Sequence, residues 1–80
     1  MNGYSYEELI DDLTIGHEIE FFYNNEKYSI SNNDRGWYLT KFNSDEYQTF
    51  NNADDLLKNA KIDSKPLIEI WELIKVETIY

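Results

Sequence analysis

The sequence predicts a small α+β domain in which helices cover mainly one face of an antiparallel sheet. Three runs between His17 and Phe42 alternate in side-chain character, and this period of two with aromatics is typical of half-buried strands. Turn-forming residues separate the runs, and the flanking segments carry apolar residues at helical spacing. The predicted order is α-β-β-β-(β)-α-α-β, in a single domain that spans residues 1–80.

The first expected helix begins at Ser5 and has one acidic side. Ser5 precedes Glu8 by three residues, which is the spacing of a capping box, and the helix should run to about Leu13. One apolar stripe of this helix should face the core: Tyr6, Leu9, Ile10 and Leu13. The opposite side carries carboxylates on an exposed ridge: Glu7, Glu8, Asp11 and Asp12.

The first hairpin should turn at the two asparagines of residues 24–25. A short hairpin loop of this kind requires positive φ, which asparagine adopts more readily than most residues. The loop would set Phe21 opposite Tyr28 and Ile19 opposite Ile30. Core-facing residues then meet core-facing residues, as a correct register requires.

The second hairpin should turn within the polar segment 32–35. This segment is rich in asparagine and aspartate, and a glycine follows it. A loop over all of 32–35 would set Trp37 opposite Ile30 and Leu39 opposite Tyr28, which keeps the large apolar groups on one face. We therefore expect this register.

The second face of the sheet is not purely polar. Phe22, Tyr38 and Phe42 share it, and Tyr47 joins them if residues 47–50 form a fourth strand. Two interpretations stay open at this point. Either helices cover these aromatics and make them core, or the face is open and forms an aromatic contact surface with an acidic rim.

Two further helices and a last strand follow. Asn51 is the expected N-cap of a helix over 52–60, and Ser64 the expected cap of the next helix, whose first turn contains proline. Residues 75–80 alternate and should join the sheet. The expected core is Leu9, Ile10, Leu13, Ile19, Phe21, Tyr28, Ile30, Trp37, Leu39, Leu56, Leu57, Leu67, Ile70, Trp71 and Ile74.

The charge balance limits the possible partners. The 80 residues include 16 acidic and 7 basic ones, which gives a net charge of −9. Such a chain repels nucleic-acid backbones and anionic membranes, whereas it attracts a basic protein. The alternative interpretation is that the acidity only serves solubility. We expect a cytoplasmic protein, since no leader precedes the first helix and no apolar run has the length of a membrane span.

The sequence predicts no catalytic, cofactor-binding or metal site. The segment around Asn33 resembles a calcium loop, but Arg35 occupies a ligand position and Phe42 stands where the final glutamate belongs. His17 is the only histidine and there is no cysteine, so the usual zinc sites have no complete set of residues. Ser29 or Ser31 could lie near His17, but no strained nucleophile turn of the G-x-S-x-G kind occurs, so we expect no histidine-based triad. No phosphate-binding glycine motif occurs. We therefore expect a protein that is not an enzyme.

A resemblance accompanies this interpretation. The run from YEELIDDLTIGHEIEFFYNNEKYSIS to YQTFNNADDLLKNAKIDSKPLIEIW resembles uncharacterised small acidic proteins of Firmicutes and their mobile elements. Size and charge are also similar in type to those of phage-borne inhibitors of bacterial defence, such as anti-CRISPR proteins, and of immunity proteins that neutralise toxins. The resemblance implies no catalytic residue.

The leading hypothesis is a non-enzymatic acidic protein-binding module that inhibits a basic, nucleic-acid-handling partner such as a bacterial defence nuclease. A toxin-neutralising immunity protein and a housekeeping domain are the alternatives, and the oligomeric state stays open. Carboxylates would compete for a basic groove, or aromatic side chains would anchor the partner. The expected partner-binding residues are Glu7, Glu8, Asp11, Asp12, Glu18, Glu20, Phe22 and Tyr38.

Overall fold

The computed structural model describes residues 3–80 and has the predicted α+β architecture. Its main sheet is antiparallel and has the strand order β4-β3-β2-β1-β7, while β5 and β6 form a separate two-stranded ribbon. The elements in chain order are α1 (Tyr6–Thr14), β1 (Ile19–Tyr23), β2 (Glu26–Asn33), β3 (Gly36–Lys41), β4 (Tyr47–Phe50), α2 (Ala53–Asn59), β5 (Lys61–Ile62), β6 (Lys65–Pro66), α3 (Leu67–Ile70), the 3₁₀ turn η1 (Trp71–Leu73) and β7 (Lys75–Ile79).

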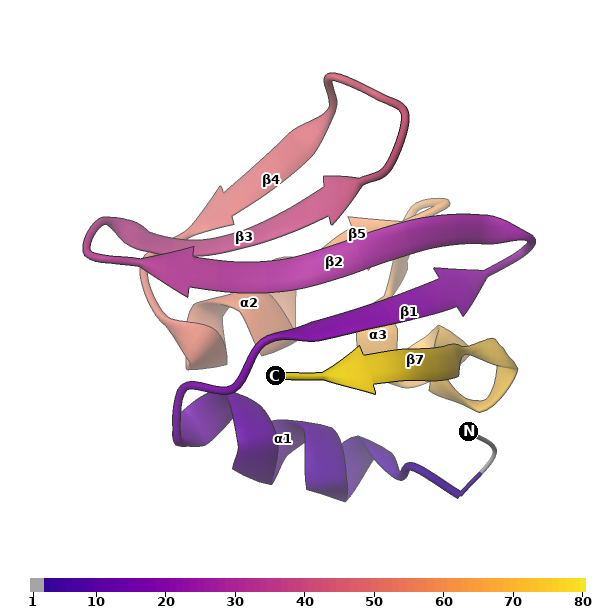
Figure 1. Cartoon of the computed structure of the whole chain (residues 1–80), viewed down its shortest axis with the longest axis horizontal. Coiled ribbons are helices and arrows are strands. Elements are labelled where there is room, and N and C mark those ends of the chain that lie inside the picture. Colours follow the sequence, from indigo (N-terminus) through magenta and orange to yellow (C-terminus); the bar gives the residue numbers. More distant parts are fainter. Residues whose placement is uncertain (1–2) are drawn as a thin grey trace.

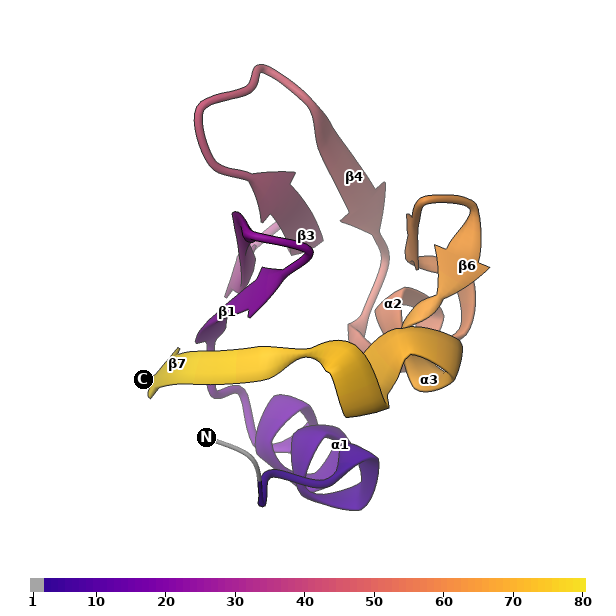
Figure 2. The ribbon, with the colours of Figure 1, turned by 90° about the vertical axis from the view of Figure 1, so that its right-hand side faces the viewer.

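The helices cover one face of the sheet. In Figure 1, α2 and α3 lie behind the strands, and α1 runs along the β7 side of the sheet. The turned view in Figure 2 shows α2, α3 and β6 together on one side, with α1 beneath β7. No described element covers the opposite face, so the prediction of helices mainly on one face is confirmed.

The first hairpin forms as predicted, and the second has a different register. Residues 24–25 have φ values of 53° and 64°, and Phe21 lies opposite Tyr28. In the second hairpin, however, Ile30 lies opposite Leu39, so the expected pairing of Ile30 with Trp37 is wrong. Strand β2 continues two residues further than predicted, to Asn33, and only Asp34 and Arg35 form the loop. A shift of two residues keeps every side chain on its predicted face.

Two predicted helix starts are wrong by short distances. Asn52, not Asn51, caps α2, since its Oδ1 accepts a hydrogen bond from the Asp55 N–H at 2.8 Å. Ser64 caps no helix, because Asp63 and Ser64 have φ values of 54° and 65° and form the turn between β5 and β6. As a result α3 begins after the proline of β6 and is only one turn long.

The core lies between the sheet and the helices and contains most of the expected residues. The prediction that Ile10 belongs to the core is wrong, since Ile10 is 38% exposed. Trp37 and Leu57 pack against the core but are only half-buried. No helix of the described residues has the length and apolar character to cross a membrane. The buried residues that the sequence analysis missed are Tyr4, Tyr23, Ala60, Ile62 and Val76.

Candidate functional site

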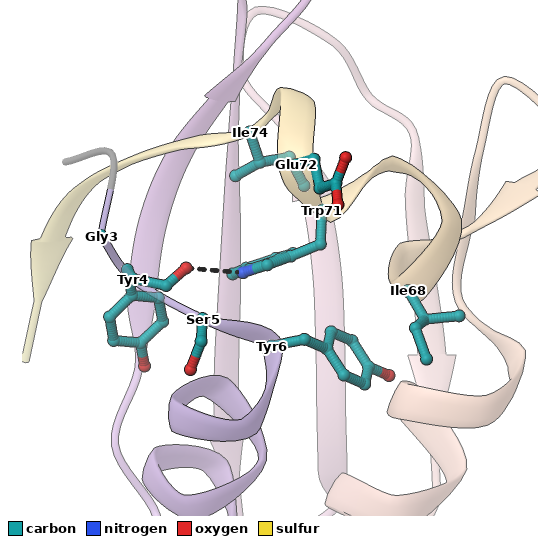
Figure 3. A pocket seen from close by; sticks show the side chains of 8 residues that line it. All are labelled: Gly3, Tyr4, Ser5, Tyr6, Ile68, Trp71, Glu72 and Ile74. Atoms are coloured by element: carbon teal, nitrogen blue, oxygen red, sulfur yellow. Dashed lines mark hydrogen bonds between the residues drawn. The ribbon is translucent and has the colours of Figure 1, made fainter.

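A groove separates the start of α1 from η1, and its position follows from how α1 begins. The Ser5 Oγ accepts a hydrogen bond from the Glu8 N–H at 3.1 Å, and the Glu8 carboxylate accepts one from the Ser5 N–H at 3.2 Å. This capping box fixes the chain as it enters α1. The groove beside it has a volume of about 560 Å³. Its lining residues are Gly3, Tyr4, Ser5, Tyr6, Ile68, Trp71, Glu72 and Ile74 (Figure 3).

Trp71 forms the aromatic base of this α1–η1 groove. Its Nε1 donates a hydrogen bond to the Tyr4 carbonyl oxygen at 2.9 Å, which ties η1 to the segment before α1 (Figure 3). The ring centroids of Tyr4 and Tyr6 lie 6.2 and 6.0 Å from that of Trp71, within the usual range for aromatic pairs. Trp71 is only 6% exposed, so the base of the groove is fixed by core packing.

The two tyrosines are held by hydrogen bonds to the fold. The Tyr4 hydroxyl contacts the Asp12 carboxylate and the Glu8 carbonyl oxygen, and burial followed by the Asp12 hydrogen bond raises the pKa of Tyr4. The Tyr6 hydroxyl donates to the Leu57 carbonyl oxygen at 3.3 Å, and burial raises the pKa of Tyr6. Both phenols are thus kept neutral and in place.

Carboxylates without an ion pair lie on the helical elements that form the groove, and one of them, Glu72, lines it. Residues 3–26 contain no lysine or arginine, and none of the residues that line the groove is basic. The salt bridges within the described part of the chain involve Glu20, Glu26, Asp54 and Glu77, and none of these belongs to α1, α3 or η1. We call the remaining carboxylates of α1, α3 and η1 the acidic surface: Glu7, Glu8, Asp11, Asp12, Glu69 and Glu72.

The uncovered side of the sheet is a second candidate surface, and its residues form rows across the strands. Phe22 lies beside Lys27, and the Phe42 N–H bonds the carbonyl oxygen of Lys27, so these three side chains form one row. Tyr38 belongs to another row, in which it lies between Ser31 of β2 and Thr49 of β4. We call this the outer sheet face; its residues are Glu20, Phe22, Lys27, Ser29, Ser31, Tyr38, Thr40, Phe42, Tyr47 and Thr49.

Lys27 forms ion pairs beside the Phe22 row. Its Nζ lies 3.1 Å from Glu20 and 2.8 Å from Glu77, and 4.9 Å from the centroid of the Phe42 ring. A hydrogen bond from Tyr80 and then one from Lys27 lower the pKa of Glu20. The carboxylates of this part of the outer sheet face therefore share an ion-pair partner, unlike those of the acidic surface.

Tyr38 and Tyr47 form the aromatic end of the same face. Their ring centroids are 6.5 Å apart, and the Tyr38 hydroxyl donates to the Asn33 side chain at 3.1 Å. Tyr47 is 63% exposed and Phe42 is 40% exposed. The interpretation that helices cover these aromatics is wrong, because no described helix lies over this face (Figures 1 and 2).

The predicted partner-binding residues fall on two separate surfaces. Glu7, Glu8, Asp11 and Asp12 lie on α1, whereas Glu20, Phe22 and Tyr38 lie on the outer sheet face. Glu18 belongs to neither group, since its Oε2 accepts a hydrogen bond from the Asn32 backbone at 2.9 Å.

Sequence reasoning missed the α1–η1 groove because its two walls are far apart in the chain. Tyr6 and Trp71 were correctly placed on apolar helical stripes, but nothing in a stripe shows that the two rings lie beside one open groove. Glu72 follows Trp71 directly and was not singled out. No signal within either segment identifies the groove, since Tyr4 and Trp71 are 67 positions apart.

His17 lies between α1 and β1. Its Nδ1 is buried and has no hydrogen-bond partner among the described residues, while its backbone N–H bonds the Asp12 carbonyl oxygen at 2.9 Å. Among residues 3–80, no group of three histidine, cysteine, aspartate or glutamate side chains is arranged to hold a metal ion.

Comparison with protein-family models, with curated proteins and with solved structures found no significant match for this chain.

Proposed function

We propose that this chain is a non-enzymatic protein-binding module whose acidic surface and α1–η1 groove receive a basic protein partner. The observation that supports this proposal is the coincidence of an aromatic groove with carboxylates that have no ion-pair partner in the described structure. An apolar centre within a polar rim is the usual composition of a protein interface. Charge of one sign around it selects partners of the opposite sign and speeds their encounter.

In its sharper form, the proposal identifies the partner as a nucleic-acid-handling enzyme of the cytoplasm. Such enzymes carry basic surfaces that bind phosphate groups. A chain with a net charge of −9 can occupy a surface of that kind and exclude the nucleic acid. The chain would then act as an inhibitor, for example of a bacterial defence nuclease. A basic toxin would be neutralised by the same chemistry, which makes the immunity role the second candidate.

Two variants with equal net charge test which carboxylates bind the partner. The first neutralises four exposed groups of the acidic surface: Glu7→Gln, Asp11→Asn, Glu69→Gln and Glu72→Gln. The second neutralises the same number of exposed groups elsewhere: Asp34→Asn, Asp45→Asn, Glu46→Gln and Asp63→Asn. Glu8 and Asp12 are left intact, because they hold the capping box and Tyr4.

The immobilised proteins would be exposed to a bacterial lysate at low salt and washed with increasing salt. We expect the wild type and the second variant to retain the same basic protein and the first variant to lose it. We expect salt to release the partner, because dissolved ions screen the attraction between exposed charges. The screening length is about 10 Å at 0.1 M salt and shortens as the salt concentration rises. Equal retention by both variants would contradict the proposed surface, and capture of no basic protein would favour the housekeeping alternative.

The captured protein distinguishes inhibitor from immunity protein. An inhibitor should displace a labelled oligonucleotide from the partner, and the first variant should fail to do so at equal concentration. A toxin partner should lose its toxic activity on binding.

The outer sheet face is the competing surface, since its aromatics are exposed and its charges are locally paired. Binding there would be nearly independent of salt. It would be lost in Tyr47→Ala and retained in Ile68→Ala, a change at a position with a similar exposed fraction on α3.

A further inference from the structure

The aromatic side chains of the α1–η1 groove have no hydrogen-bond donor left for a ligand. The Trp71 Nε1 donates to the Tyr4 carbonyl oxygen, and the Tyr6 hydroxyl donates to the Leu57 carbonyl oxygen. Trp71 and Tyr4 are 6% and 8% exposed, so the ring surface that the groove offers a ligand is mainly that of the half-buried Tyr6. Because burial and hydrogen bonds hold these side chains in place, a ligand would lose little free energy in ordering them.

The rim of the groove supplies a charge of one sign. Glu72 is exposed and makes no hydrogen bond or salt bridge within residues 3–80. Its side chain lies beside the Trp71 ring in Figure 3, at the edge of the groove opposite Ser5. None of the described residues that line the groove is a lysine or an arginine, so none of them neutralises this carboxylate.

We infer that the α1–η1 groove is a recognition site for a cationic side chain, in the first place an arginine of the partner. The aliphatic part of that side chain would lie on Ile68, which is exposed, and its guanidinium group would lie between the half-buried Tyr6 ring and the Glu72 carboxylate. Aromatic rings attract cations through their negative faces, and guanidinium groups pair with carboxylates and stack on aromatics. This inference rests on the proposed function, because it assigns the anchor residue of the same partner.

The charge of the groove argues against other small ligands. An anion would meet Glu72 without a compensating cation among the residues that line the groove, and the Ser5 and Glu8 N–H groups at the start of α1 already bond each other's side chains. A purely apolar ligand would leave Glu72 unpaired at the rim. With a volume of about 560 Å³, the groove has room for a side chain together with parts of its neighbours.

The test is an NMR titration of the ¹⁵N-labelled full chain with two peptides that differ only in charge. The probes are acetyl-Gly-Arg-Gly-amide and the same peptide with citrulline, whose urea group has the shape of the guanidinium group without its charge. Trp37→Phe assigns the two indole signals. We expect the arginine peptide to shift the Trp71 indole signal and the amide signals of Ile68 and Glu72. The citrulline peptide should bind about two- to fivefold more weakly, which corresponds to a pair of exposed charges.

Glu72→Gln and Glu69→Gln are matched variants of this experiment. Both remove an exposed carboxylate of the same segment, but only Glu72 lines the groove. Glu72→Gln should lower the affinity for the arginine peptide by about two- to fivefold, and Glu69→Gln should change this affinity by less than about twofold. Shifts confined to the outer sheet face, equal shifts by both peptides, or no shift up to the solubility limit would each overturn the inference.

The titration and the lysate experiment can fail separately. If a basic protein is captured through the acidic surface but the arginine peptide does not shift Trp71, the anchor site is wrong and the proposed function stands. If the peptide binds in the groove but no basic protein is captured, the site stands and the proposed function is wrong.

Discussion

At Gly36 the backbone passes so close to β4 that a side chain has no room. A Cβ atom at this position would lie 2.3 Å from the Phe50 carbonyl oxygen, and the φ angle is 148°. Both features favour glycine, since other residues rarely adopt this conformation.

Gly36→Ala should destabilise the fold by about 1–3 kcal/mol, the usual cost of a strained backbone position. The matched control is Gly3→Ala, where a Cβ atom would meet nothing within 4 Å. Urea unfolding of both variants measures the difference. A stability of Gly36→Ala equal to that of the control would show that β4 can move away freely.

Tyr4 is the residue that joins the start of the chain to α1 and η1. Tyr4→Phe removes the hydrogen bonds to Asp12 and the Glu8 carbonyl oxygen, and we expect a loss of about 1–2 kcal/mol. Tyr23→Phe is the matched control, since Tyr23 is equally buried and its hydroxyl makes no hydrogen bond among the described residues. Equal losses in the two variants would contradict a role of the Tyr4 hydroxyl.

The raised pKa of Tyr4 has a consequence at alkaline pH. In the folded state the phenol keeps its proton to higher pH than in the unfolded state, whose tyrosines titrate near pH 10. The unfolded state therefore binds fewer protons above this pH, and the free energy of unfolding should fall as pH rises. Between pH 8 and about pH 11, the free energy of unfolding should fall less in Tyr4→Phe than in Tyr23→Phe.

At the scale of elements, the two edge strands of the sheet differ. The ladder of β7 with β1 contains an irregularity between Glu20 and Phe21, and β7 lies beside α1 in both views (Figures 1 and 2). The β4 ladder is regular, and its outer edge faces away from the other strands (Figure 1). The Lys41 N–H bonds the Glu46 carbonyl oxygen, so the alternation of an antiparallel ladder directs the Thr49 N–H outward.

Proline substitutions in β4 test this alternation. Thr49→Pro should cost less than about 1 kcal/mol, because the lost N–H faces solvent. Gln48→Pro should cost about 3 kcal/mol or more, because it removes a ladder hydrogen bond. Gln48→Ala separates the backbone effect from the loss of the side-chain hydrogen bonds to Lys61. Thermal unfolding ranks the variants, and equal losses for the two prolines would show that the alternation is wrong.

The sequence predicted these elements better than their exact limits. The paired asparagines of residues 24–25 determined the first hairpin, because positive φ is a local requirement. The second hairpin was misplaced by two residues because alternation is identical after such a shift, and the contact of Gly36 with Phe50 is not local. The third helix was overestimated for a similar reason, since its apolar stripe is shared by α3, η1 and the following extended segment.

At the scale of the whole molecule, charge is distributed unevenly. The acidic surface lies on α1, α3 and η1. Five of the seven basic residues lie between positions 35 and 65, in β3, α2, the β5–β6 ribbon and the loop before β3: Arg35, Lys41, Lys58, Lys61 and Lys65. The sequence already showed the net charge and the acidic side of α1. It could not show that Glu72 joins them beside the groove, because that requires the packing of η1 against Tyr4 and Tyr6.

Repulsion within the acidic surface should make stability depend on salt. Raising the ionic strength should increase the free energy of unfolding of the wild type, because like charges in the folded state are screened. The increase should be smaller in the variant with four neutralised carboxylates on the acidic surface. It should be larger in the variant of the same net charge whose four neutralised carboxylates lie outside the acidic surface. Urea unfolding at low and high sodium chloride measures both. An identical salt response would show that the carboxylates act only through total charge.

The pairing of β7 with β1 also sets the order in which the sheet can be completed. Residues 75–79 return to the strand that begins the sheet, and Trp71 bonds the carbonyl oxygen of Tyr4. Contacts of such large sequence separation slow folding, because a long loop must close before they form. During synthesis β1 to β4 can pair as local hairpins, but the β1 edge stays unpaired until residues 75–79 are present, so a newly made chain depends on its final segment to close the sheet.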